Sequence, residues 1–98
     1  MYEKIFVARS ALYQVASLFE NGELSTPEVA ALKLYASEMC LEVTRAAVQL
    51  HGARGLVHAS LVERYFRDAQ LLTISEGSSE ICQIVISRRL YNGSDTLY

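Results

Sequence analysis

The chain has 98 residues and a net charge of −2, and 51% of its residues are hydrophobic. This length allows one domain, and the high apolar fraction indicates apolar surface that packs against a partner or another domain. Because the lysines and arginines are scattered, nucleic acid and anionic membranes are not expected partners. No stretch approaches the roughly 18 apolar residues of a membrane-spanning helix, and the first residues do not resemble a signal peptide.

A first helix is predicted over Tyr2 to Glu20, ended by Asn21-Gly22, since both residues tolerate left-handed dihedral angles. Apolar residues recur in it at helical spacing: Ile5, Ala8, Leu12, Val15 and Phe19. Tyr2, Phe6 and Tyr13 are expected to serve packing.

A second helix starts at Ser25 or Thr26, with Pro27 at its first position and Glu28 near its positive end. It is expected to end at Gly52 and Gly55, and it carries a second apolar stripe: Leu32, Ala36, Met39, Val43, Ala46 and Leu50. The short loop between the two helices predicts an antiparallel pair.

After a loop from His51 to Ala59, a third helix is predicted over Leu61 to Ala69. Ser60 and Glu63 have the spacing of a capping box, in which Ser60 bonds forward and Glu63 bonds back. On this helix Arg67 and Asp68 are expected to form a structural ion pair.

A fourth helix starts at Ser78 or Ser79 and is expected to bury Ile81, Ile84 and Val85. Residues 92 to 95 read as a solvated tail. The fold class is therefore all-α, an antiparallel up-and-down bundle of about four helices in a single domain over residues 1–98.

Neither the cysteines nor the histidines indicate a metal site. Cys40 and Cys82 lack CxxC spacing and are typical of reduced core residues in an intracellular protein. His51 and His58 lack the Glu-x-x-His spacing of bundle metal sites. We expect His51 to form a hydrogen bond in a loop and His58 to lie on the surface.

The turn from Glu76 to Glu80 is the strongest candidate site. A carboxylate precedes Gly77, and Ser78 and Ser79 then open a helix, which brings an acid, backbone N–H donors and a positive helix end together. Chemistry on an anionic or carbonyl ligand needs these groups. Taken alone, however, a Glu-Gly-Ser-Ser sequence is more often a helix cap.

Four spaced motifs carry a resemblance to a known family. They are QLHGA at residues 49–53, VERYFRDA at 62–69, ISEGSSEI at 74–81 and ISRRL at 86–90. Together they resemble the end of the acyl-CoA dehydrogenase family, flavoenzymes that introduce a 2,3 double bond into acyl-CoA thioesters. The resemblance implies the helical C-terminal bundle of that family.

The resemblance implies that Glu76 is the base that removes the acyl α-proton while FAD accepts the β-hydride. It also implies that Gly77 contacts the thioester of the acyl-CoA substrate. A homo-oligomer, dimer or tetramer, is implied, together with electron-transfer flavoprotein or another electron acceptor. The expected location is the cytoplasm in a bacterium or the mitochondrial matrix in a eukaryote.

Two sets of residues are implied to contact FAD. The first follows the base: Ser78, Ser79 and Glu80. The second is a turn that in the family usually touches the flavin of a neighbouring subunit: Gln49, Leu50, His51, Gly52 and Ala53.

Family enzymes are several-fold longer, so the chain corresponds to a C-terminal portion that supplies the base and FAD contacts to a larger enzyme. Alone, it is expected neither to hold flavin tightly nor to turn over. The alternative is a stand-alone or truncated helical oligomerisation or interaction module, derived from that family and without catalytic activity.

Overall fold

The computed structural model describes residues 1–92, which form α1 (Tyr2–Glu20), α2 (Thr26–His51), the short 3₁₀ helix η1 (Gly52–Leu56), α3 (Leu61–Leu72) and α4 (Ser79–Asn92). No strand occurs in these residues. The predicted all-α fold with four helices is confirmed. Asn92 was expected in the tail but ends α4, and the rest of the predicted tail lies outside the described residues.

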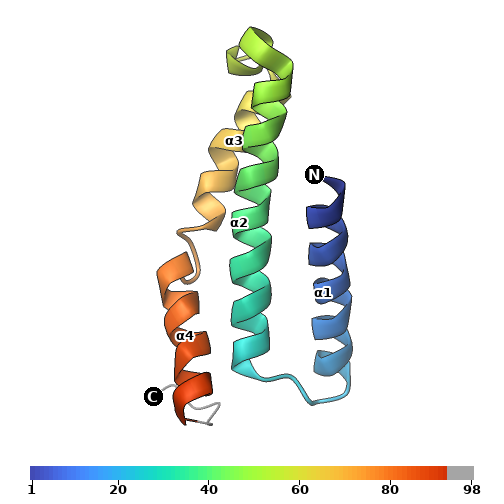
Figure 1. Cartoon of the computed structure of the whole chain (residues 1–98), viewed down its shortest axis with the longest axis vertical. Coiled ribbons are helices and arrows are strands. Elements are labelled where there is room, and N and C mark those ends of the chain that lie inside the picture. Colours follow the sequence, from blue (N-terminus) through green and yellow to red (C-terminus); the bar gives the residue numbers. More distant parts are fainter. Residues whose placement is uncertain (93–98) are drawn as a thin grey trace.

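The central element of the structure is α2. As Figure 1 shows, α1 runs antiparallel along one side of α2, while α3 and α4 follow each other down the other side. Among the described residues, α1 packs on α2 and contacts neither α3 nor α4. The helices therefore form one layer, 49 × 24 × 18 Å, with a radius of gyration of 15.9 Å. A compact domain of this length has about 13 Å.

Such a layer leaves little interior. The buried hydrophobic side chains of the described residues are Ala30, Ala69 and Cys82. Larger apolar side chains lie at the surface, including Phe19 at 70% exposure and Leu50 at 78%. The apolar surplus of the sequence is thus surface, which is typical of a face that packs against further protein.

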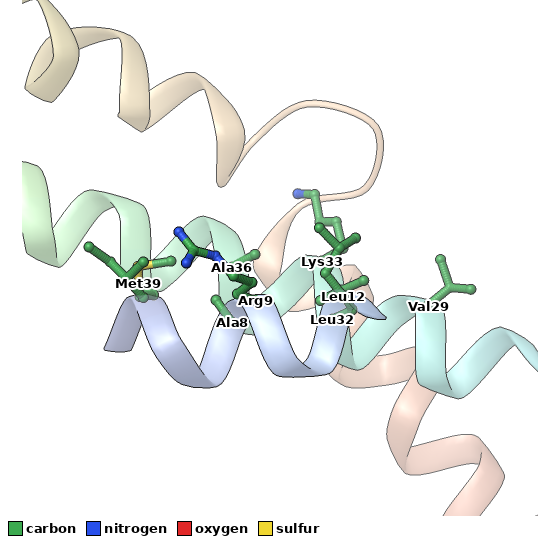
Figure 2. Close-up of a pocket in the computed structure, with 9 residues that line it drawn as sticks. Ala8, Arg9, Leu12, Val29, Leu32, Lys33, Ala36 and Met39 are labelled. Atoms are coloured by element: carbon green, nitrogen blue, oxygen red, sulfur yellow. The ribbon is translucent and has the colours of Figure 1, made fainter. Parts of the chain in front are cut away.

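Parts of the two predicted apolar stripes face each other between α1 and α2, whereas Phe19 and Leu50 lie outside this region and are exposed. The facing parts line an open groove of about 500 Å³ with Ile5, Ala8 and Leu12 on one side and Leu32 and Ala36 on the other (Figure 2). Two cationic side chains, Arg9 and Lys33, also line it.

The predicted capping box at α3 is wrong. Ser60 is the N-cap residue, but its side chain makes no capping hydrogen bond. Glu63 instead pairs with Arg67, whose Nε lies 3.0 Å from Glu63 Oε1. The predicted Arg67–Asp68 pair is also wrong, because Asp68 pairs with Arg64 at 3.6 Å. Both observed pairs have i,i+4 spacing, which places side chains on one helix face, whereas adjacent residues diverge.

The prediction for the buried face of α4 is wrong for two residues. Ile81 and Ile84 are exposed, Val85 is half-buried, and Cys82 is buried instead. The reason is a tertiary contact: Ser79 bonds to Glu38 of α2, and Cys82 lies three residues further on the same helix face.

Two other boundaries also differ from the predictions. α3 continues to Leu72, and the predicted loop after α2 contains η1. Gly55 makes this turn possible, since a Cβ there would lie 2.7 Å from the Val48 carbonyl oxygen.

Of the remaining single-residue predictions, some are confirmed and others are wrong. Cys82 is a core residue as predicted, whereas Cys40 is half-buried. His58 is exposed as expected. His51 ends α2 rather than lying in a loop, and its Nδ1 lies 2.8 Å from the Ala47 carbonyl oxygen. No helix within residues 1–92 is long and apolar enough to cross a membrane.

Candidate functional site

The turn between α3 and α4 holds the predicted base in an uncommon backbone conformation. Glu76 has φ of +56° and Gly77 has φ of +98°, so two consecutive residues are left-handed. For glycine this is free of steric cost, but for Glu76 it costs about 1–2 kcal/mol. The Glu76 side chain is exposed. Contacts from elsewhere in the chain must therefore hold this conformation.

The first of these contacts comes from Lys33 of α2. Its ammonium donates to the carbonyl oxygen of Leu72 at 2.7 Å and to that of Gly77 at 2.6 Å. Figure 2 shows the Lys33 side chain extending from α2 toward this loop. A hydrogen bond to a charged group contributes about 1.5–3 kcal/mol, so the two bonds together exceed the cost of the left-handed Glu76.

The second contact comes from Glu38, one turn further along α2. Ser79 is buried, and its hydroxyl donates to Glu38 Oε1 at 2.5 Å. The Ser79 backbone N–H donates to the Thr73 carbonyl oxygen at 3.0 Å. These bonds attach the start of α4 both to α2 and to the end of α3. Because both polar hydrogens of Ser79 are used within the chain, the FAD contact assigned to Ser79 stays a prediction.

The first turn of α4 begins as the sequence predicts. The Ser78 hydroxyl accepts a hydrogen bond from the Ile81 N–H at 3.3 Å, which satisfies one donor of the helix end. Ser78 is half-buried and Glu80 is exposed. Beneath them, Cys82 Sγ lies 3.9 Å from the Gly77 carbonyl oxygen. Ser78 and Glu80 are thus on the accessible side of the turn.

The second predicted set of residues lies at the far end of α2. Gln49, Leu50 and His51 form its last turn, and Gly52 and Ala53 begin η1. All five are exposed, and Gly52 has φ of +62°. Lys33 of α2 bonds to the Glu76 turn. It precedes Gln49 by 16 residues, or about 24 Å of helix.

One copy of the chain therefore does not bring the two predicted sets together (Figure 1). Gln49 to Ala53 lie where α2 passes into η1, whereas Glu76 to Glu80 lie where α3 meets α4. Within residues 1–92 no three His, Cys, Asp or Glu side chains gather where they could hold a metal ion.

Sequence reasoning did not identify Lys33 and Glu38. Both residues are half-buried on α2, and their spacing in the sequence matches no known motif. Lys33 meets Gly77 across 44 positions of sequence, and Glu38 meets Ser79 across 41. The available signal is a lysine beside Leu32 in the apolar ALKLYA segment, which indicates a cation that has a partner in the fold.

Comparison with known proteins matches residues 1–91 to the family model for the acyl-CoA dehydrogenase C-terminal domain. The caffeyl-CoA reductase–Etf complex subunit CarC of Acetobacterium woodii is 42% identical over 90 residues. The cyclohexane-1-carbonyl-CoA dehydrogenase of Geobacter metallireducens is 38% identical over 87 residues. These alignments cover 92% and 89% of this chain.

The fold agrees with these sequence matches. The structure of butyryl-CoA dehydrogenase from Megasphaera elsdenii superimposes with a TM-score of 0.88 at 33% identity, covering 92% of this chain and 24% of that one. The chain likewise spans about a quarter of the curated relatives, 24% of CarC and 23% of the cyclohexane-1-carbonyl-CoA dehydrogenase. The chain belongs to the acyl-CoA dehydrogenase family and corresponds to the helical C-terminal domain of that family.

Proposed function

We propose that this chain supplies the catalytic base, Glu76, to an FAD-dependent enzyme that removes hydrogen from the α and β carbons of an acyl-CoA thioester. The observation that carries the proposal is the exposed Glu76 carboxylate on a left-handed turn that Lys33 and Glu38 hold against α2. Membership of the acyl-CoA dehydrogenase family supports it.

In the proposed reaction, Glu76 accepts the α-proton of the thioester. Thioester α-protons are weakly acidic, so the carboxylate must lie within hydrogen-bond reach of the proton, at a site that stabilises the developing enolate. Gly77 suits a position beside the thioester, because a side chain is absent there and substrate can approach the backbone.

The described residues fit FAD as the cofactor. Ser78 and Glu80 lie accessible at the positive N-terminal end of α4, where polar and anionic groups are stabilised. Gln49 to Ala53 form an exposed surface with small residues at Gly52 and Ala53. Bound FAD would supply the hydride-accepting chemistry.

A second copy of the chain is part of the proposal. Because Lys33, which bonds to the Glu76 turn, lies about 24 Å along α2 from Gln49, one flavin would meet the two sets most simply from two subunits. The exposed apolar side chains provide surface for such packing. An electron-transfer flavoprotein is the proposed electron acceptor, by analogy with CarC, whose name places it in an Etf complex.

The test uses the complete flavoprotein that contains this chain, either as one polypeptide or assembled with its partner. Glu76→Gln should abolish exchange of the substrate α-proton with deuterated solvent while the flavin absorbance is unchanged. Glu23→Gln, which alters an exposed carboxylate between α1 and α2, is the matched control. Retained exchange in Glu76→Gln would remove Glu76 from its proposed role.

A helical interaction module without catalytic activity is the competing proposal, favoured by the exposed apolar surface. A flavin absorbance spectrum of the purified chain, recorded with and without candidate larger subunits, separates the two. If no partner restores bound FAD, the enzymatic proposal fails for this chain.

A further inference from the structure

We infer that Lys33 is a positioning residue for Glu76, and that it sets where the carboxylate sits by fixing the backbone on both sides of it. This role rests on the proposed function of Glu76. It concerns a side chain that belongs to none of the four motifs and lies on a different helix.

The two carbonyl oxygens that Lys33 binds bracket the segment that bears Glu76. Leu72 is the last residue of α3, and its carbonyl has no partner within the helix because the last four carbonyls of any helix lack one. Gly77 follows Glu76 directly. One ammonium, 2.7 Å from the first oxygen and 2.6 Å from the second, therefore joins both ends of the segment from 73 to 76.

Among the described residues, the other backbone hydrogen bonds of this turn hold the neighbours of Glu76 and Gly77. The Ser75 N–H donates to Leu71 O at 2.9 Å, which fixes the first half of the turn. Ser79 is fixed by Glu38 and Thr73. At Gly77 itself, the Lys33 bond of 2.6 Å is much closer than the 3.9 Å contact with Cys82 Sγ.

The orientation of the Gly77 carbonyl is coupled to the direction of the Glu76 side chain. Gly77 has no Cβ and moves freely among backbone conformations, so without a fixed carbonyl the turn can rotate about the bonds on either side of it. Such rotation swings the neighbouring carboxylate. The rate of proton abstraction depends on the distance between the carboxylate and the α-proton. A displacement of about 1 Å lowers this rate by up to roughly a hundredfold.

Lysine suits this task better than a neutral side chain. Its ammonium has three donors on one small centre, so it can serve two carbonyls that approach from different directions. Lys33 lines the apolar groove between α1 and α2, and its aliphatic stem extends from there, so that the ammonium lies at the turn (Figure 2). Methionine retains an apolar stem and removes the donors, which makes Lys33→Met the informative substitution.

The experiment compares Lys33→Met, Lys33→Arg and the control Lys4→Met in the complete flavoprotein. Lys4 also reaches α2, through Glu42, but from α1, which lies on the side of α2 away from α3 and α4 (Figure 1). Five quantities are measured: amide hydrogen exchange of residues 73–79, kcat, KM for substrate, the rate of α-proton exchange, and the flavin absorbance.

Lys33→Met should accelerate amide exchange in residues 73–79 by roughly tenfold or more. It should lower kcat and the rate of α-proton exchange by roughly tenfold to a hundredfold, with KM and flavin content little changed. Lys33→Arg retains donors and should restore part of the rate. Lys4→Met should alter neither the turn nor kcat.

The result that overturns the inference is amide exchange in residues 73–79 that is the same in Lys33→Met as in the wild type. A loosened turn with an unchanged rate of α-proton exchange also overturns it. If Lys33→Met does not fold, Lys33→Arg becomes the test variant. A folded Lys33→Arg protein with faster amide exchange in residues 73–79 but a wild-type rate of α-proton exchange would contradict the positioning role.

The two failures are distinguishable. If Glu76→Gln abolishes α-proton exchange and Lys33→Met does not change it, the inference fails and the proposed function stands. If Glu76→Gln retains exchange, the proposed function fails, and with it the role of Lys33 in proton transfer.

Discussion

The hydroxyl of Ser79 donates to Glu38 Oε1 at 2.5 Å, across 41 positions of sequence. This bond joins the first residue of α4 to the middle of α2 and decides which face of α4 is buried. Glu38 lies five residues after Lys33 on α2, so two polar contacts little more than one helical turn apart hold the α3–α4 turn.

Loss of the Ser79 hydroxyl should loosen the start of α4. A hydrogen bond to a charged group is worth about 1.5–3 kcal/mol, so Ser79→Ala should accelerate amide exchange in the first turn of α4 roughly tenfold to a hundredfold. The control is Ser87→Ala, because the Ser87 hydroxyl donates within α4, to Ile84 O. Equal exchange rates in the two variants would show that the Glu38 bond does not hold the helix.

The two serine N-caps should differ in their contribution to stability. Ser78 bonds to the Ile81 N–H, whereas the Ser60 side chain makes no capping bond. We expect Ser78→Ala to cost about 1 kcal/mol and Ser60→Ala to stay within about 0.5 kcal/mol. Local opening free energies from amide exchange of α4 and α3 measure this. A larger loss at Ser60 would contradict the observed caps.

Gly77 and Gly55 should resist substitution for different physical reasons. An added Cβ at Gly77 meets no described atom within 4 Å, so Gly77→Ala should cost about 1–2 kcal/mol through its positive φ. At Gly55 the added atom would lie 2.7 Å from Val48 O. Asparagine tolerates left-handed dihedral angles, so Gly77→Asn should recover stability that Gly77→Ala loses, whereas Gly55→Asn should be no better than Gly55→Ala. Thermal unfolding of the four variants checks this pattern.

The ion pair between Lys4 and Glu42 should weaken in alkali. The hydrogen bond and the charge of Glu42 raise the pKa of Lys4 above its ordinary value of 10.5. Since the folded-state pKa is the higher one, the stabilisation is fully present below pH 10.5 and is lost as pH rises through the raised pKa. The small difference in melting temperature between the wild type and Lys4→Met should therefore be constant below pH 10.5 and shrink as the pH rises above it. High salt should also reduce it, because the pair is exposed. If the difference in melting temperature instead grows at alkaline pH, it does not come from the Lys4–Glu42 ion pair.

The boundaries of α1 and α2 could be predicted from the sequence because local chemistry sets them. Asn21-Gly22 ends α1, Pro27 starts α2, and the positive φ of Gly52 ends α2. These residues act through their own dihedral preferences, with no partner elsewhere in the chain.

The buried face of α4 and the residues that hold the Glu76 turn could not be predicted in this way. Ile81, Ile84 and Val85 occupy more than one face of the helix, so periodicity does not choose among them. The choice depends on Glu38 and the turn geometry on Lys33, both more than 40 positions away. Glu63, likewise, has a partner in Arg67 that competes with the capping box.

The spacing of Lys33 and Glu38 along α2 fixes the conformation of the Glu76 turn. Each residue added to a helix advances it by about 1.5 Å and rotates it by about 100°, so an insertion between Lys33 and Glu38 would turn one of them away from its carbonyl or hydroxyl partner. The segment from 21 to 25 makes no such contact with the α3–α4 turn among the described residues. Changes of length should therefore be tolerated between α1 and α2 but not within the short stretch of α2 from Lys33 to Glu38.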